Sequence, residues 1–430
     1  MKRDKMSKGM YVQIRKLLDM VSDAIQYIEA IGDSGEEDDQ LIDKLETDLR
    51  YTTETVNMEL LYSSKVQFCR LDDLAKKKGE PGYRQELLTQ YFIWLGKITE
   101  ILEKQYHAEN VWDERFIRLM DYIRYVDIDE IVERVKDSLF GKSAEEIAHL
   151  CRYYQTFHEM WGTLDAPNDR YDVIINRVTA LKEHREDFLW LYGRIGDQRS
   201  RLVLTCMLYS WITFDKNYID EMKETNYTDY FDLDLVECDE KEVVVDLGAW
   251  TGDSALNYIQ TYGRYKKMYC YEIDASSMEA MKKNLSEYPD IIFKNKGVGN
   301  KNSIGYVDGS MPSCNKLVEQ NTGRKIEMVR LDDDIDEKVT LIKMDIEGAE
   351  QDALSGSVRH IREEHPKLLI SVYHNNEDIW KIPRMIIDIN PDYQLFLRSN
   401  GAQWGPSEIV LLAIDKNRKT TNRSKCKQED

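Results

Sequence analysis

Closely spaced cysteines and long apolar runs are both missing from this sequence. Its seven cysteines are scattered over 430 residues with no C-x-x-C pair. An odd number of scattered thiols in a long chain favours free cysteines in a reducing compartment over a disulfide framework. The longest nearly apolar run, residues 202–214, is shorter than the ~20 residues that a membrane span needs. The charged N-terminus is followed by no apolar segment, which argues against a signal peptide. We therefore expect a cytoplasmic protein without a membrane span.

Basic residues are also fewer than acidic ones. The sequence has 59 Lys and Arg residues against 79 Asp and Glu residues, which gives a formal net charge of −20. Nucleic acids and anionic membranes both bind positively charged surfaces. Neither is expected as a partner, unless a local basic patch provides the contact. The length predicts two or three domains and is sufficient for a full hydrophobic core.

A strand, a glycine loop and a helix are expected in residues 243–254, which read VVVDLGAWTGDS. The β-branched run is typical of a strand buried on both faces, and Asp246 stands near its end. Gly248 and Gly252 follow in a tight loop, and Asp253 opens the helix. In open α/β sheets, ligands bind at the carboxyl ends of the strands, so this loop predicts a ligand site.

The spacing of the glycines indicates which ligand. A dinucleotide site needs G-x-G-x-x-G, but Trp250 stands where the second glycine would be. Asp253 would also place a negative charge where a phosphate should lie. The pattern D-x-G-x-x-x-G instead suits a cofactor that lacks phosphate and has a cationic end, and S-adenosylmethionine fits that description. A βα turn with accidental glycines is the alternative.

Two further segments could complete a cofactor site. A second strand at residues 267–272 ends at Glu272, where a carboxylate can accept hydrogen bonds from both ribose hydroxyls. The alternative is an ordinary exposed acid at a strand end. A third strand is expected at residues 291–294. It is followed by 297–299, where Val298 could lie against an adenine ring, although a β-turn is the simpler interpretation.

A second dense cluster of acids lies in residues 341–350, LIKMDIEGAE. An apolar strand leads to Asp345 and Glu347, which are expected near the methyl-bearing sulfonium. There a carboxylate can stabilise the cation, orient the acceptor or take its proton. Asp345, Glu347 and Glu350 could also bind a hard cation, but such sites usually need more ligands, so no metal is predicted. Acids that favour a helix dipole are the alternative.

The strand expected at residues 368–373 delivers His374 to the same edge of the sheet. Histidine titrates closest to neutral pH, so it is a natural base for a hydroxyl acceptor. Residues 393–398 and 409–414 are expected to close the sheet as an antiparallel pair.

The first 235 residues look helical. Apolar residues at alternating spacings of three and four predict amphipathic helices, for example Ile14, Leu18, Val21, Ile25 and Ile28. Four parts are expected: a helical hairpin or bundle at 1–110, a helical lead-in at 111–235, an α/β domain at 236–415 and a polar tail at 416–430. The N-terminal helices could also form a homo-oligomer, since apolar stripes must be covered.

Five motifs in order resemble the FkbM family of S-adenosylmethionine-dependent methyltransferases: VVVDLGAWTGDSA, YEID, LDDDID, LIKMDIEGAE and ISVYHNNEDIWKIP. The resemblance covers about residues 185–414 and includes FLWLYGRIGDQRSR and Tyr230-Phe231 before the domain. It implies an α/β class I methyltransferase, with a Rossmann-like sheet of seven strands of which the last is antiparallel. It also implies O-methylation, often of sugar or polyketide hydroxyls.

The resemblance also implies site residues. Asp246, Gly248, Gly252 and Glu272 would hold the cofactor, Asp345 would lie beside it, and Glu347 and His374 would face the acceptor. The expected function is O-methylation of a sugar, glycan or similar small acceptor. The alternatives are an NAD-dependent dehydrogenase, a non-enzymatic scaffold with a relic sheet, and a nucleic-acid methyltransferase, which the charge disfavours.

Overall fold

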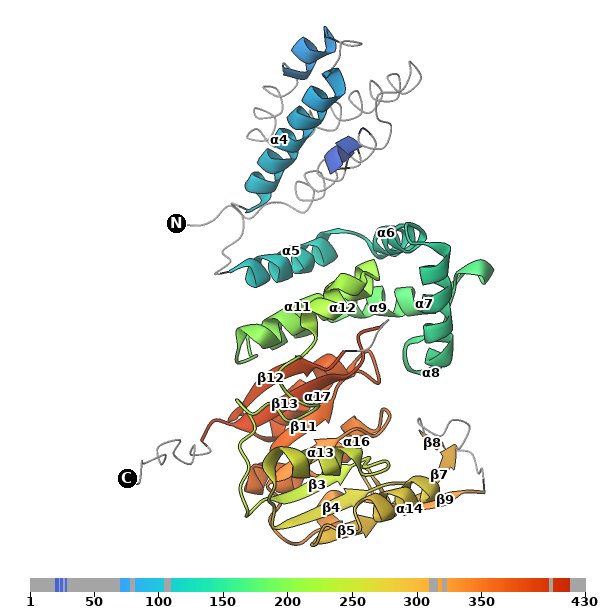
Figure 1. Cartoon of the computed structure of the whole chain (residues 1–430), viewed down its shortest axis with the longest axis vertical. Coiled ribbons are helices and arrows are strands. Elements are labelled where there is room, and N and C mark those ends of the chain that lie inside the picture. The colour runs from blue at the N-terminus through green and yellow to red at the C-terminus, as the bar shows by residue number, and fades with distance from the viewer. Residues whose placement is uncertain are drawn as a thin grey trace. The chain divides into compact units, whose positions relative to one another are not determined.

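The computed structural model describes residues 20–22, 24, 25, 28, 70–77, 82–103, 110–308, 316–318, 323–401 and 405–417. The chain divides into two compact units, residues 1–127 and 128–430, and Figure 1 labels the elements of both. The lead-in helices from residue 128 onward therefore share a unit with the sheet. The sequence alone had predicted a separate lead-in beginning at residue 111.

The described part of the first unit is helical. Val21, Ile25 and Ile28 are helical and buried, as the apolar stripe predicts. Ile14 and Leu18 lie outside the described residues. Helix α4 (Tyr83–Glu103) buries one face, and α5 (Val111–Tyr125) begins at Asn110, whose side chain accepts hydrogen bonds from two backbone N–H groups. The buried residues of α4 are Tyr83, Leu87, Tyr91, Trp94 and Ile98.

The second unit opens with a helical layer that packs against the edge of a sheet. Ser200 is buried in this layer, and its hydroxyl accepts a hydrogen bond of 2.8 Å from the Leu397 N–H in the sheet. Two short strands, β1 (Leu164–Asp165) and β2 (Arg170–Tyr171), interrupt the helices. The helices are α6 (Ile128–Phe140), α7 (Ala144–Thr156), α8 (His158–Trp161), α9 (Asp172–Glu183), α10 (Arg185–Tyr192), α11 (Gln198–Thr213) and α12 (Lys216–Met222).

A seven-stranded sheet forms the core of the second unit, in the order β12-β13-β11-β10-β3-β4-β5. All neighbours pair in parallel except β13, which runs antiparallel to both β11 and β12. This confirms the predicted class I methyltransferase-like fold with its last strand reversed. The strands are β3 (Val243–Leu247), β4 (Lys267–Tyr271), β5 (Ile291–Lys294), β10 (Leu341–Met344), β11 (Lys367–Ser371), β12 (Tyr393–Ser399) and β13 (Ile409–Asp415).

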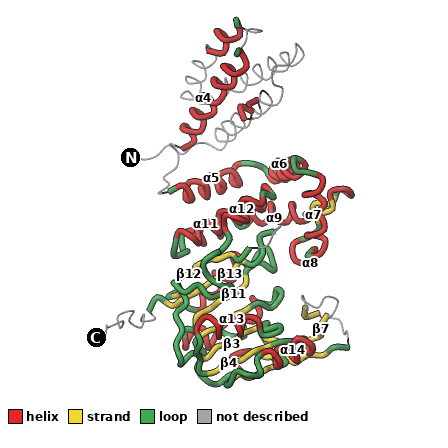
Figure 2. The backbone as a smooth tube through the Cα atoms, viewed as in Figure 1, coloured by secondary structure: helices red, strands yellow, loops and turns green. Residues whose placement is uncertain are grey.

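Apolar strands and amphipathic helices explain this arrangement. All five residues of β3 are buried, as expected for a strand covered on both faces. Helices alternate with the strands along the chain, as Figure 2 shows in red and yellow. They are α13 (Asp253–Tyr262), α14 (Ala275–Asn284), α15 (Leu331–Asp334), α16 (Glu350–Ser355), the π-helical turn η2 (His360–Glu364) and α17 (Asp378–Ile389).

A second, smaller sheet lies between β5 and β10 in the sequence and was not predicted. Its order is β6-β9-β7-β8. The β-turn considered for residues 297–299 is wrong, because Gly297 and Val298 form β6, which pairs in parallel with β9. The strands are β6 (Gly297–Val298), β7 (Ser303–Asp308), β8 (Lys316–Val318) and β9 (Lys325–Val329).

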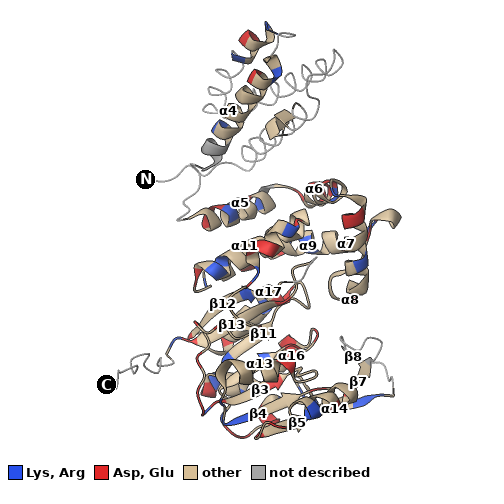
Figure 3. Ribbon diagram, viewed as in Figure 1, with Lys and Arg blue, Asp and Glu red and all other residues tan. Residues whose placement is uncertain are grey.

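The apolar run at 202–214 belongs to α11, most of which is buried. Among the helices in the described ranges, none has the length and apolarity to cross a lipid bilayer. Acidic and basic residues are interspersed along the ribbon (Figure 3).

Candidate functional site

A cavity of about 300 Å³ opens at the carboxyl ends of the central parallel strands. Its volume is at the lower end of the range for small-molecule sites. Six of the nine predicted site residues line it, and the other three, Asp246, Gly252 and His374, lie outside its lining. The six are Gly248, Asp253, Glu272, Val298, Asp345 and Glu347.

The glycine loop after β3 is shaped by backbone contacts. Gly248 has φ +79°, and a Cβ there would lie 1.8 Å from the backbone oxygen of Asp345. The N–H groups of Gly248 and Ala249 donate to the Tyr271 carbonyl at 3.0 and 2.9 Å. Gly252 has φ +87° and immediately precedes α13. Glycine is therefore required at 248 for two reasons, since the conformation is left-handed and there is no room for a side chain.

Asp246 supports this loop from behind the cavity. The Ser254 hydroxyl donates to its carboxylate at 2.5 Å, and the Lys343 ammonium lies 3.1 Å from it. Lys343 also donates to the Gly248 carbonyl at 2.9 Å. Burial acts to lower the pKa of Lys343, but the charges of Asp246 and Asp345 outweigh it and raise that pKa. A buried cation therefore fixes the loop, and sequence reasoning did not identify it.

Glu272 lies at the end of β4, as predicted, and its carboxylate is anchored. One oxygen accepts the Trp250 N–H at 3.0 Å, and the other accepts the Asp274 N–H at 2.6 Å. Burial raises the pKa of Glu272. An ionised carboxylate has about four acceptor positions, so two hydroxyl donors can still bind.

The cavity lining is predominantly acidic. Asp229, a residue that no sequence motif indicated, lines it together with Asp253. Burial raises the pKa of both carboxyl groups, and like charges nearby add to the effect. Of the two lining lysines, Lys296 is paired with Glu327 and Asp334, and Lys343 is paired with Asp246. The cavity therefore favours a cationic ligand.

Asp345 joins the sheet to the segment before it. The Tyr230 hydroxyl donates to its carboxylate at 2.7 Å, and Tyr230 has φ +69°. Burial opposes ionisation of Asp345, but the charges of Lys343 and His374 keep its pKa below the usual value. Tyr230 stood in the lead-in motif, but only the structure shows that it lines the cavity.

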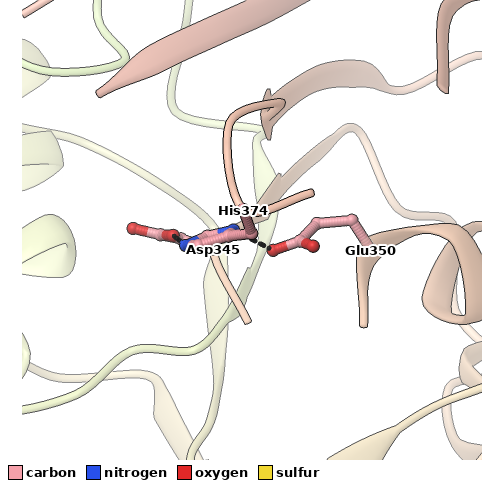
Figure 4. Close-up of side chains that lie close together, drawn as sticks. All are labelled: Asp345, Glu350 and His374. Carbon is pink, nitrogen blue, oxygen red and sulfur yellow. Dashed lines mark ion pairs between the residues drawn. The ribbon is translucent and has the colours of Figure 1, made fainter. Parts of the chain in front are cut away.

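His374 is buried among carboxylates. Its Nδ1 lies 2.9 Å from Glu350, and its Nε2 lies 3.4 Å from Asp345 and 3.8 Å from Glu347. Figure 4 shows Asp345 and Glu350 on either side of the ring. Burial would lower the pKa of His374, but Glu350 and then Asp345 and Glu347 raise it to about 10. His374 is therefore an imidazolium near neutral pH. An imidazolium has no free nitrogen to accept a proton, so this environment does not favour the role of base, which stays a prediction.

Three of these side chains carry groups that can bind a metal ion. Ligand atoms of Asp345, Glu350 and His374 lie within 4.8 Å of one another. However, the two carboxylates contact different ring nitrogens, whereas an imidazole binds a metal through one nitrogen. In this arrangement the three side chains form a chain of ion pairs through the two ring nitrogens.

The sequence from the end of β3 to the end of β12 matches one family model. Residues 246–403 match the model of the methyltransferase FkbM domain. The chain contains a methyltransferase FkbM domain. The FkbM domain thus includes all nine predicted site residues, six in its first half and Asp345, Glu347 and His374 in its second half. No curated protein is significantly similar to the chain.

Solved structures of methyltransferases resemble parts of the chain. Methyltransferase FkbM from Methylobacillus flagellatus KT is 27% identical, with a TM-score of 0.48, over 55% of this chain and 61% of that one. An rRNA methylase from Streptococcus thermophilus is 13% identical, with a TM-score of 0.29, over 41% and 88%. Aeropyrum pernix fibrillarin, which has natively bound S-adenosyl-L-methionine, is 14% identical, with a TM-score of 0.28, over 42% and 70%.

Proposed function

We propose that this protein is an S-adenosylmethionine-dependent O-methyltransferase that acts on a hydroxyl of a sugar, glycan or similar small acceptor. The observation that carries the proposal is the acidic cavity at the strand ends of the FkbM domain, lined by Gly248 and Glu272. Bound there, S-adenosylmethionine would supply an activated methyl group.

The cavity fits this cofactor in its residue types. Glu272 offers acceptors to two ribose hydroxyls, and Val298 offers an apolar surface to the base. Asp229 and Asp253 offer carboxylates to an ammonium group. A dinucleotide needs cations or free helix N–H groups for its pyrophosphate, but Asp253 occupies the first turn of α13. These features favour S-adenosylmethionine over NAD.

The acidic residues expected to face the methyl acceptor also favour a neutral acceptor molecule. Glu347 and Glu408 line the cavity near Asp345, so an anionic acceptor would be repelled. Carboxylates accept hydrogen bonds from hydroxyl groups, which supports a hydroxyl-rich acceptor such as a sugar. Positioning of that hydroxyl would supply much of the rate enhancement.

Calorimetric titration of the full-length protein tests the proposal. S-adenosylmethionine and S-adenosylhomocysteine should bind at one site, and NAD should not. Binding should also change tryptophan fluorescence, because Trp250 lies at the cavity and is 48% exposed. If neither methionine-derived ligand binds, the proposal fails. If both bind but no methyl transfer to a panel of sugars occurs, the scaffold alternative gains support.

Glu272→Gln tests the ribose contact. The substitution makes two charge-assisted hydrogen bonds neutral, and each such bond contributes about 1.5–3 kcal/mol, so we expect about a tenfold or larger loss of affinity for S-adenosylmethionine. The control is Glu279→Gln on α14, whose side chain is 73% exposed and pairs with Lys282. Equal affinities of the two variants would remove Glu272 from the cofactor site.

A further inference from the structure

Glu408 lies in the wall of the cavity at the strand ends. It immediately precedes β13. Because β13 runs antiparallel to β11, its first residues lie at the edge where the parallel strands end. Glu408 lines the cavity together with Asp345 and Tyr373. None of the sequence motifs includes it.

The segment that carries Glu408 is held by the helical layer. A Cβ at Gly405 would lie 2.6 Å from the Tyr153 ring, so this aromatic side chain on α7 packs directly on the backbone. The Trp161 indole N–H at the end of α8 donates to the Tyr373 carbonyl at 2.7 Å. These contacts fix both Glu408 and its neighbour Tyr373 in the cavity wall.

The backbone at Glu408 is also unusual. Its φ is +57°, a left-handed conformation that costs a non-glycine residue free energy and is concentrated at functional sites. The Asn400 N–H donates to the Glu408 carbonyl at 3.0 Å and helps to hold it. The fold therefore maintains a strained conformation that places this carboxyl group at the cavity.

The surroundings of Glu408 suit proton transfer near neutral pH. Burial raises the pKa of Glu408 to about 7, and the charges of Asp345 and Asp229 contribute, while His374 and the Tyr373 hydroxyl oppose the shift. The phenol groups of Tyr230 and Tyr153 also interact electrostatically with Glu408. A general base works best when its pKa lies near the working pH. Two neighbouring groups are less suited, because the surrounding carboxylates raise the pKa of His374 and favour its imidazolium form, while the lowered pKa of Asp345 makes it a weaker base.

We infer that Glu408 is the general base that accepts the proton of the methyl acceptor. This inference rests on the function proposed above. In the step, the acceptor oxygen bonds to the methyl carbon while the carbon–sulfur bond breaks and its electron pair stays on sulfur. The hydroxyl proton passes to the Glu408 carboxylate and is then released to solvent.

Proton-linked calorimetry tests the role of Glu408 without knowledge of the methyl acceptor. S-adenosylmethionine is titrated into the full-length protein at pH 7 in two buffers of different ionisation enthalpy. A sulfonium bound beside a half-protonated carboxyl group should expel up to about half a proton per ligand. Glu408→Gln should abolish that part of the release, whereas Glu279→Gln should keep it. S-adenosylhomocysteine, which lacks the sulfonium charge, should expel less.

Tyr373→Phe provides a second variant. Loss of the hydroxyl that stabilises ionised Glu408 should raise the pH at which proton release is half-maximal. If S-adenosylmethionine binds and both variants release protons as the unchanged protein does, the role of Glu408 is overturned while the proposed function stands. If S-adenosylmethionine does not bind at all, the proposed function fails, and the role of Glu408 fails with it.

Discussion

At the scale of single residues, the charge state of His374 links the site to stability. The side chain is buried with Glu350, which is completely inaccessible to solvent. The pKa of His374 rises from 6.5 to about 10 in the folded chain. Between these values the folded state binds more protons than the unfolded state, so the free energy of unfolding falls as pH rises. The stabilisation is complete below pH 6.5 and is lost as pH rises through about 10.

His374→Gln should remove this pH dependence. We expect a loss of about 3–5 kcal/mol at pH 7, because the substitution leaves buried carboxylates without their cation. The measurement is urea unfolding of both proteins at pH 6, 7.5 and 9.5. Lysine and tyrosine side chains also titrate at high pH, but they do so in both proteins. A stability difference that stays constant from pH 6 to 9.5 would contradict the prediction.

The positions of site residues were more predictable than their roles. Strand ends placed Glu272, Asp345 and His374 at one edge, as found. The charge of His374 could not be predicted, because it depends on contact with Glu350 from α16. Asp246 lies within β3 near its end, as predicted, and side chains of a strand alternate between the two faces. Its carboxylate therefore meets Lys343, and no motif indicated that pairing.

At the scale of elements, the glycine loop has one position where a side chain cannot fit. The substitution Gly248→Ala places a Cβ against the backbone that follows β10, and it also forces alanine to adopt an unfavourable positive φ. The loop must therefore move. We expect at least a tenfold loss of affinity for S-adenosylmethionine, measured by calorimetry. Gly263→Ala is the matched control, because Gly263 has φ +69° with no atom within 4 Å of the added Cβ.

This pair of variants separates two effects. Gly263→Ala should cost about 1 kcal/mol of stability through φ alone and leave binding unchanged. Gly248→Ala should lose both stability and binding. Unchanged affinity in Gly248→Ala would show that the close approach of the loop to β10 does not shape the site.

Elements with continuous apolar runs were predictable, and those held by distant pairing were not. The parallel strands of the main sheet were expected from their buried sequences. In the second sheet, β7 contains Gly305 and has no continuous buried apolar run, since Ile304 is exposed, so local sequence gives little strand signal. Its strands form because β9 pairs with both β6 and β7. The contact of Trp161 with Tyr373 spans 212 residues and has no local signature either.

At the scale of the whole molecule, helical pattern alone did not show which helices belong with the sheet. The helices before and after residue 127 have similar patterns of apolar and charged positions. Ion pairs tie the segments before the sheet to β12, since the buried Arg398 lies 2.7 Å from Asp197 and 2.6 Å from Asp232. Such pairs join residues that are far apart in the sequence and are visible only in three dimensions.

The cavity lies wholly within the second unit, because its lining residues fall between Asp229 and Glu408. A chain that begins at residue 128 should therefore fold and bind S-adenosylmethionine. Its affinity should lie within about twofold of that of the full-length protein, a difference in binding free energy well under 1 kcal/mol. Circular dichroism and calorimetry measure the two properties. If the N-terminal helices form a homo-oligomer, light scattering should show the full-length protein as an oligomer and the shortened chain as a monomer. A shortened chain that folds but loses the ligand would mean that residues 1–127 help to build the site.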